Sequence, residues 1–129
     1  MTPTAESVLG TFGECQPLFT ALGDDRRQAI IALLLKAGGE ASVGEIAERL
    51  GLSQPAVSHH LKILRAARLL TVERRGTLRY YTLNGAELTE LLAPLRELVD
   101  QITACADEPG IHERNQAGTP SAARESPPK

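Results

Sequence analysis

His59 and His60 are the residues of this chain that most readily suggest chemistry, because paired imidazoles often bind a metal ion. They are adjacent in the run SQPAVSHHLK, residues 53–62. Successive side chains on a helix point about 100° apart, whereas histidine ligands on one helix favour a spacing of three or four. No cysteine is near the pair, and the third histidine, His112, lies far away in a polar stretch. The sequence therefore disfavours a metal site here.

Capping signals predict three helices around the pair. Asp24 precedes a helix over residues 25–37, which Gly38–Gly39 ends. Ser42 and Glu45 form a capping box at the start of a short helix, which ends at Gly51. Ser53 precedes a third helix, which has Pro55 in its first turn. The second and third helices with their glycine-containing turn fit a helix-turn-helix, whose second helix enters the DNA major groove.

The region after these helices changes character. Residues 69–83, LLTVERRGTLRYYTL, are rich in strand-forming residues, and Arg75–Gly76 supplies a tight reversal, so we expect a β-hairpin. Asn84 with Glu87 then predicts a capping box for a last helix, which Pro94 should kink or split. This last helix carries an apolar stripe formed by Leu88, Leu91, Leu95, Leu98 and Ile102.

The helix of the paired histidines has two faces of different character. Val57, Leu61, Leu64 and Arg68 share one face, of which the first three are expected in the core, with His60 at its edge as a structural, hydrogen-bonded histidine. The other side carries polar and basic residues, so His59 is expected to contact DNA. With the cations of the hairpin, the predicted DNA-binding residues are Ser53, Gln54, Ser58, His59, Lys62, Arg65, Arg74, Arg75 and Arg79.

Charge distribution supports a polyanionic partner. The whole chain has a formal net charge of -2, but residues 49–79 contain seven Lys or Arg against one acid, Glu73. A basic centre in an acidic chain favours a surface for nucleic acid, although solvated helix faces would show the same charges.

Composition indicates one soluble domain with an aliphatic core. The chain has 129 residues, 42% hydrophobic and 3% aromatic, and its two cysteines do not make a disulfide scaffold. The absence of a signal-peptide pattern and of a membrane-length apolar run predicts a cytoplasmic protein that does not enter a membrane. We expect a partly helical N-terminal extension over residues 1–14, a domain over 15–106 and a disordered tail over 107–129.

Three stretches together resemble the ArsR/SmtB family of bacterial winged-helix repressors: LFTALGDDRRQAIIALLL, SVGEIAERLGLSQPAVSHHLKILRAARLL and RRGTLRYYTLN. The resemblance covers about residues 17 to 102, and it departs from the family at Asp25, where a proline is usual. It implies a mainly α fold with a small β-hairpin wing, a homodimer formed by the first and last helices, and DNA release on inducer binding. The expected dimer interface is Phe12, Phe19, Leu88, Leu91, Leu95, Leu98 and Ile102.

The metal-sensing positions of the family hold other residues here. Arsenic and cadmium sensors of the family carry Cys-x-Cys where this chain has Ser42 and Gly44. The zinc and cobalt ligand positions correspond to Gly85, Glu87, Leu98 and Gln101, and a persulfide-sensing cysteine corresponds to Ala32. The resemblance therefore implies no metal at the usual family positions and no certain cofactor.

Cys15 and Cys105 are the remaining soft ligands. Cys15 shares a helical stripe with Phe12, Phe19 and Leu22, and Cys105 continues the apolar stripe of the last helix. Packing is one interpretation of both thiols. The alternative is an inducer or redox site at a dimer interface, binding a soft metal or metalloid, with or without His112, or forming a reversible disulfide.

The chain lacks the motifs of serine hydrolases, P-loop proteins, dinucleotide-binding enzymes and metal hydrolases, so we expect no enzymatic activity. The favoured function is a sequence-specific DNA-binding regulator, a homodimeric repressor released from an imperfectly palindromic operator by a small inducer. The alternative is a winged helix that binds only other proteins.

Overall fold

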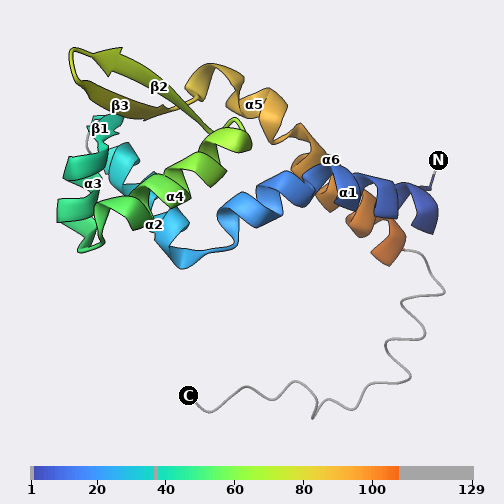
Figure 1. Ribbon diagram of the computed structural model, residues 1–129. Helices are drawn as coiled ribbons and strands as arrows, with labels where there is room; N and C mark the ends of the chain where they lie inside the picture. Colours follow the sequence, from blue (N-terminus) through green and yellow to red (C-terminus); the bar gives the residue numbers. More distant parts are fainter. Residues whose placement is uncertain (1, 37, 108–129) are drawn as a thin grey trace, which may run out of the picture. The chain divides into compact units, whose positions relative to one another are not determined.

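The structure is a computed structural model that describes residues 2–36 and 38–107 (Figure 1). Within this part, the helices are α1 (Ala5–Leu22), α2 (Asp25–Lys36), α3 (Val43–Leu50), α4 (Gln54–Ala66), α5 (Leu88–Leu91) and α6 (Ala93–Ala106). A 3-10 turn, η1 (Gly85–Glu87), precedes α5, and the strands are β1 (Glu40–Ser42), β2 (Leu70–Arg75) and β3 (Leu78–Leu83). The expected class, mainly α with a small β element, is confirmed.

The described part of the chain divides into two compact units. Among the described residues, one unit comprises residues 2–13 and 95–107, and the other is Glu14–Pro94. The expected boundary between residues 14 and 15 falls within α1 (Ala5–Leu22). The predicted disordered tail, apart from Asp107, and His112 lie outside the described residues. No helix of the described part is long and apolar enough to cross a membrane.

The predicted caps position the helix-turn-helix of α3 and α4. Ser42 and Glu45 form both hydrogen bonds of the capping box, and Gly51 ends α3 with φ +68°, a left-handed conformation that favours glycine. Ser53 caps α4 by accepting a hydrogen bond from the backbone N–H of Ala56. At α2, Asp24 accepts hydrogen bonds from the first turn, as expected.

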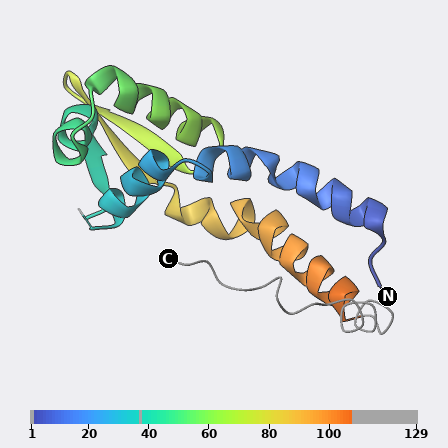
Figure 2. The same ribbon diagram turned by 90° about the horizontal axis from the view of Figure 1, so that it is seen from below.

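The hairpin is part of a three-stranded sheet with the order β1-β3-β2. The two strands of the hairpin pair from Leu70↔Leu83 to Arg75↔Leu78, so Gly76 and Thr77 form a two-residue turn, with Gly76 at φ +64°. Strand β1, which pairs with β3, was not expected from the sequence. A strand of three residues is too short to show an alternating pattern of apolar and polar residues. Figures 1 and 2 show α4 leading directly into β2.

The predicted capping box of Asn84 and Glu87 is wrong. The side chain of Asn84 instead donates to the carbonyl of Arg68, and Glu87 forms an ion pair with the Arg68 guanidinium. Arg68 therefore lies outside the buried face of α4: it follows the helix, is exposed, and has φ +65°. These tertiary contacts use both polar groups that would otherwise cap a helix. The expected split near Pro94 occurs at Leu92, between α5 and α6.

Val57, Leu61 and Leu64 of α4 are buried, as expected, beside Ile30 and Leu34 of α2 and Ile46 of α3 in the core of the Glu14–Pro94 unit. Burying such aliphatic side chains contributes about 1.5–3 kcal/mol each. This core holds the inner face of α4 and leaves its outer face to solvent.

A buried arginine joins three helices of this unit. Arg27 donates from Nε to the carbonyl of Ala21 at 2.8 Å, from Nη2 to the carbonyl of Thr20 at 2.7 Å, and from Nη1 to Nδ1 of His60 at 3.1 Å. Because Nδ1 of His60 accepts, the neutral ring carries its proton on Nε2. The expectation of a structural, hydrogen-bonded His60 is therefore confirmed.

The junction formed by Arg27, its two backbone acceptors and His60 predicts that the free energy of unfolding depends on pH. Burial of the ring lowers the pKa of His60, Asp24 opposes this shift, and Arg27, His59 and Arg26 add to it. The unfolded chain thus binds more protons near the ordinary pKa of about 6.5, so stability is fully present above that pH and falls as the pH drops below it, by at most about 1.4 kcal/mol per pH unit. Urea unfolding between pH 5 and 7.5, at one protein concentration, measures this slope.

His60→Gln removes the titrating group and should flatten the slope in this pH window. The matched control is His59→Gln, which changes the exposed neighbour and leaves the Arg27 contact intact. Equal slopes for the wild-type protein and the His60→Gln variant would show that the junction does not control this pH dependence.

Candidate nucleic-acid interface

Helix α4 presents its polar residues to solvent. Its inner face is formed by Val57, His60, Leu61 and Leu64, all buried. Every residue of α4 and its N-cap that the sequence assigned to DNA is exposed: Ser53, Gln54, Ser58, His59, Lys62 and Arg65. Ser53 already accepts a backbone hydrogen bond as the cap, so its hydroxyl retains only part of its capacity. The outer face of α4 is thus a row of donors and acceptors on a fixed helix.

The hairpin carries two cations on the face that turns toward α4. Arg74 lies directly opposite Arg79 in the ladder, two residues beyond the pair of Val72 and the buried Tyr81. Alternation puts both arginines on the same face as Tyr81. Like charges directly opposite destabilise a sheet, and neither arginine forms an ion pair with a residue that the structure describes. Both remain available to an external anion.

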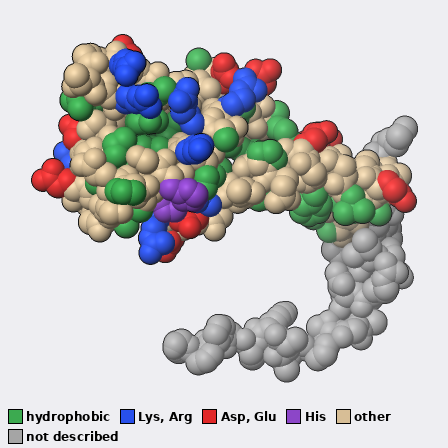
Figure 3. Space-filling model, in the orientation of Figure 1, with side chains coloured by type: hydrophobic (Ala, Val, Ile, Leu, Met, Phe, Trp, Pro, Cys, Tyr) green, Lys and Arg blue, Asp and Glu red, His purple; other side chains and the backbone are tan. Residues whose placement is uncertain are grey.

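A concave pocket joins this face to α4. Its volume is about 560 Å³, and it is lined by Ser58, Leu61, Lys62, Arg65, Ala66, Arg79 and Tyr81. Three of these residues are cations from α4 and β3, and none is acidic. Low-dielectric walls lined by one sign of charge concentrate the field on an anion. In the space-filling view, Lys and Arg side chains gather over the hairpin and α4 (Figure 3).

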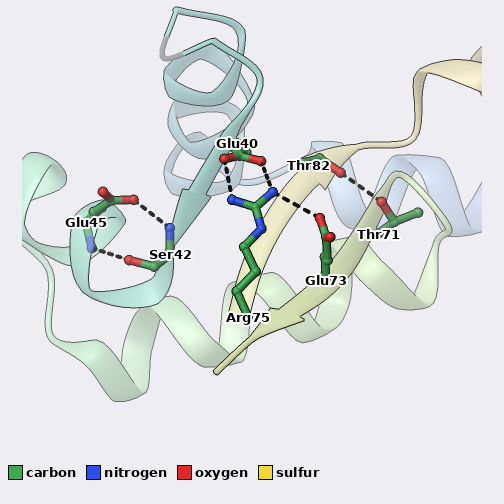
Figure 4. Close-up of polar contacts among 7 residues, drawn as sticks. All are labelled: Glu40, Ser42, Glu45, Thr71, Glu73, Arg75 and Thr82. Carbon is green, nitrogen blue, oxygen red and sulfur yellow. Dashed lines mark hydrogen bonds and ion pairs between the residues drawn. The ribbon is translucent and has the colours of Figure 1, made fainter. Parts of the chain in front are cut away.

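The structure places Arg75 apart from the other predicted contacts. It lies opposite Leu78, one position along from the Arg74–Arg79 pair, and therefore points to the other face of the hairpin. There its guanidinium binds both carboxylate oxygens of Glu40, at 2.8 and 2.7 Å, and one oxygen of Glu73 at 3.0 Å (Figure 4). Glu40 was not expected from the sequence, because an isolated acid after two glycines gives no periodic signal.

The paired histidines have different environments. The ring centroids of His59 and His60 lie 5.6 Å apart, with planes at 60°, and His60 is only 8% exposed with Nδ1 bound to Arg27. His59 is exposed beside Ser58 and Lys62. Among the described residues, no three His, Cys, Asp or Glu side chains are grouped so that they could hold a metal ion.

The two cysteines belong to different units. Cys15 is fully buried in α1, and burial, together with the charge of Glu14, raises the pKa of its thiol. A protonated, buried thiol is a poor metal ligand and a poor nucleophile. Cys105 is half-buried and lies 3.5 Å from the carbonyl oxygen of Pro3, to which its thiol donates a weak hydrogen bond.

The predicted dimer residues differ in exposure. In the Glu14–Pro94 unit, Leu88 and Leu91 are half-buried and Phe19 is exposed. In the other unit, Leu98 is buried and Leu95 half-buried, whereas Phe12 and Ile102 are exposed.

Two further exposed apolar residues of the unit formed by residues 2–13 and 95–107 were not expected from the sequence, Leu9 at 68% and Val99 at 57%. Each precedes a predicted residue, Phe12 or Ile102, by three positions. The helical spacing could therefore have found both.

Comparison with known proteins supports this geometry. Residues 24–72 match the family described as bacterial regulatory protein, arsR family. The transcriptional repressor SdpR of Bacillus subtilis is 40% identical over 73 residues, which cover 57% of this chain and 79% of the repressor.

Two solved structures are similar to this one. HlyU from Vibrio cholerae has 35% identity and a TM-score of 0.53, covering 67% of this chain and 91% of its own. An ArsR-like transcriptional regulator from Rhodococcus has 26% identity and a TM-score of 0.65, covering 86% and 98%. The winged helix-turn-helix expected from the sequence is therefore confirmed, and the chain belongs to the ArsR family of DNA-binding transcriptional regulators.

Proposed function

We propose that the chain is a homodimeric repressor that binds an imperfectly palindromic operator, with α4 in the major groove and the hairpin beside it on the phosphate backbone. The observation that carries this proposal is the basic pocket between α4 and β3, because it combines the outer face of the helix with a cation of the hairpin. The basic charge and the family both favour DNA over a purely protein partner.

Within this proposal the side chains divide into two groups. Gln54 and Ser58 combine donors and acceptors and suit base edges, and His59 suits a base or a phosphate. The cations suit phosphate oxygens, with lysine acting as a point charge and arginine as a bidentate hydrogen-bond donor. These cations are Lys62, Arg65, Arg74 and Arg79. Ser53 completes the set at the start of α4. Arg75 is left out, because two carboxylates already bind it.

The operator itself tests the proposal. Two recognition helices related by a two-fold axis should select half-sites whose centres lie about 10 base pairs, or a small multiple of that, apart. Fragments enriched from random DNA by the purified protein, followed by footprinting, should show this repeat. Recovery of one unrepeated half-site bound by a monomer would contradict the proposal, as would the absence of any enrichment.

Replacing Arg74 or Arg79 by Ala should weaken binding to all DNA sequences to a similar degree. Each lost phosphate contact should reduce the slope of log affinity against log salt by about 0.9. Fluorescence anisotropy over a salt series measures both quantities. Arg96→Ala, at an exposed arginine of α6 outside the proposed contacts, is the control that should leave the slope unchanged.

Replacing Gln54 or Ser58 by Ala should instead narrow the difference in affinity between operator and random DNA. A lost base contact costs about 1–3 kcal/mol of discrimination and little of the salt dependence. If both groups of variants lose specific and random binding equally, the assignment of α4 residues to bases is wrong.

The unit formed by residues 2–13 and 95–107 supports dimerisation through its exposed apolar residues. Leu9, Phe12, Val99 and Ile102 are all at least 39% exposed. We infer that a second copy of the chain covers them, as the resemblance to the family implies.

Val99→Glu adds a charge without disturbing the chain's own core, since Val99 is 57% exposed. If a partner covers this position, the uncompensated charge should cost several kcal/mol of association. Analytical ultracentrifugation should then show monomers, and operator affinity should fall. The control is Ala104→Glu, which places the same charge at another exposed position of α6. A Val99→Glu variant that sediments as a normal dimer would place the interface elsewhere.

A further inference from the structure

The outer face of the hairpin holds a compact ionic cluster around Arg75. The guanidinium binds both carboxylate oxygens of Glu40 and one oxygen of Glu73, and it lies 4.6 Å from the centroid of the Tyr80 ring. Bidentate pairing with one carboxylate, together with a cation–π contact, restricts the guanidinium far more than an ordinary surface ion pair. Figure 4 shows Arg75 between Glu40 and Glu73.

Glu40 connects this cluster to the start of the helix-turn-helix. It lies in β1, two residues before Ser42, the N-cap of α3. Ser42 and Glu45 lock that cap by reciprocal hydrogen bonds of 2.9 and 3.2 Å. Arg75 is the last residue of β2 and lies at the hairpin turn. Its ion pair with Glu40, 35 residues earlier in the sequence, therefore connects the turn to the segment that begins α3.

The tip of the hairpin has little else to hold it. Beyond the pair of Glu73 and Tyr80, the residues up to the turn are exposed, and β2 is an edge strand of the sheet. A two-stranded ribbon without a buried face is marginally stable. Arg74 and Arg79 also face each other as like charges in this ribbon, which favours their separation.

We propose that Arg75 is a positioning residue for DNA binding: by clamping the hairpin tip to Glu40 of β1, it holds Arg74 and Arg79 where the phosphate backbone runs. This inference rests on the proposed DNA-binding function. Arg75 acts through its neighbours and does not touch DNA. The hydrogen bond from Arg75 lowers the pKa of Glu40.

Glu40→Gln distinguishes a positioning role from direct contact by the sign of its effect. If Arg75 positions the tip, losing the carboxylate loosens the hairpin, and operator affinity should fall by about fivefold. If Arg75 contacts phosphate, the same change frees a cation and removes a negative charge, so affinity should rise. The charge-matched control is Glu48→Gln on α3, an exposed acid that forms no ion pair with a described residue. It should raise affinity slightly.

A charge reversal gives a second, independent test. Arg75→Glu alone should weaken operator binding. Combined with Glu40→Arg, it restores an ion pair across the same two positions at unchanged net charge, and a positioning role predicts recovery of most of the affinity. Direct contact predicts no recovery, because the new acid at position 75 would still face phosphate.

The Thr71→Val variant distinguishes a general loss of sheet stability from a specific loss of the Arg75 cluster. This change removes the hydrogen bond between the hydroxyls of Thr71 and Thr82, 2.8 Å apart on the same outer face, and leaves the Arg75 cluster intact (Figure 4). It should lower thermal stability without the fivefold loss of operator affinity. Hydrogen exchange at the hairpin tip should accelerate in Glu40→Gln and not in Thr71→Val.

Affinities are measured by anisotropy with an enriched operator fragment at one salt concentration. Tighter binding by Glu40→Gln, or a double reversal as weak as Arg75→Glu alone, would overturn the positioning role. A wild-type protein that binds no DNA even at low salt would overturn the proposed function instead, so the two failures are distinguishable.

Discussion

The buried guanidinium of Arg27 is the constraint on which the DNA-binding unit depends. A charge removed from water is costly unless hydrogen bonds replace its hydration. Arg27 meets this requirement with the carbonyls of Thr20 and Ala21 at the end of α1 and with His60 of α4. Those carbonyls belong to the last turn of a helix, where intrahelical donors are lacking and the dipole is negative. The end of α1, the start of α2 and the middle of α4 can therefore take few other arrangements.

This junction also explains the paired histidines. His60 turns inward to accept the bond from Arg27, so its helix neighbour His59 must turn outward. The orientation that satisfies the buried arginine thus exposes the residues proposed to contact DNA. The same rotation of α4 buries the hydrogen bond of His60 and exposes the residues proposed to bind DNA. This arrangement accounts for the two adjacent histidines without a metal ion.

The arginines of the hairpin form a local electrostatic conflict that the proposed DNA contact would account for. Arg74 and Arg79 are opposed like charges, an arrangement that a sheet selected only for stability would avoid. Such local conflicts are expected at functional sites. Arg75 differs in its neighbours rather than its type, because alternation turns it to the face where Glu40 and Glu73 lie. Under the proposed function, three nearby arginines of one short segment are consequently divided between an external anion and the protein itself.

The sequence by itself determined the helices of the helix-turn-helix, the hairpin and the buried face of α4. Caps at Ser42 and Ser53, the left-handed glycine at position 51 and the strand-forming run of the hairpin are local signals, and each acts within a few residues. The spacing of Val57, Leu61 and Leu64 likewise identified the inner side of α4. Tertiary structure alone decided which polar groups meet across long separations. It paired Arg75 with Glu40, and it diverted Asn84 and Glu87 from a helix cap to Arg68. Such contacts depend on where distant segments lie in space. The sequence around a carboxylate does not indicate which cation it will pair with.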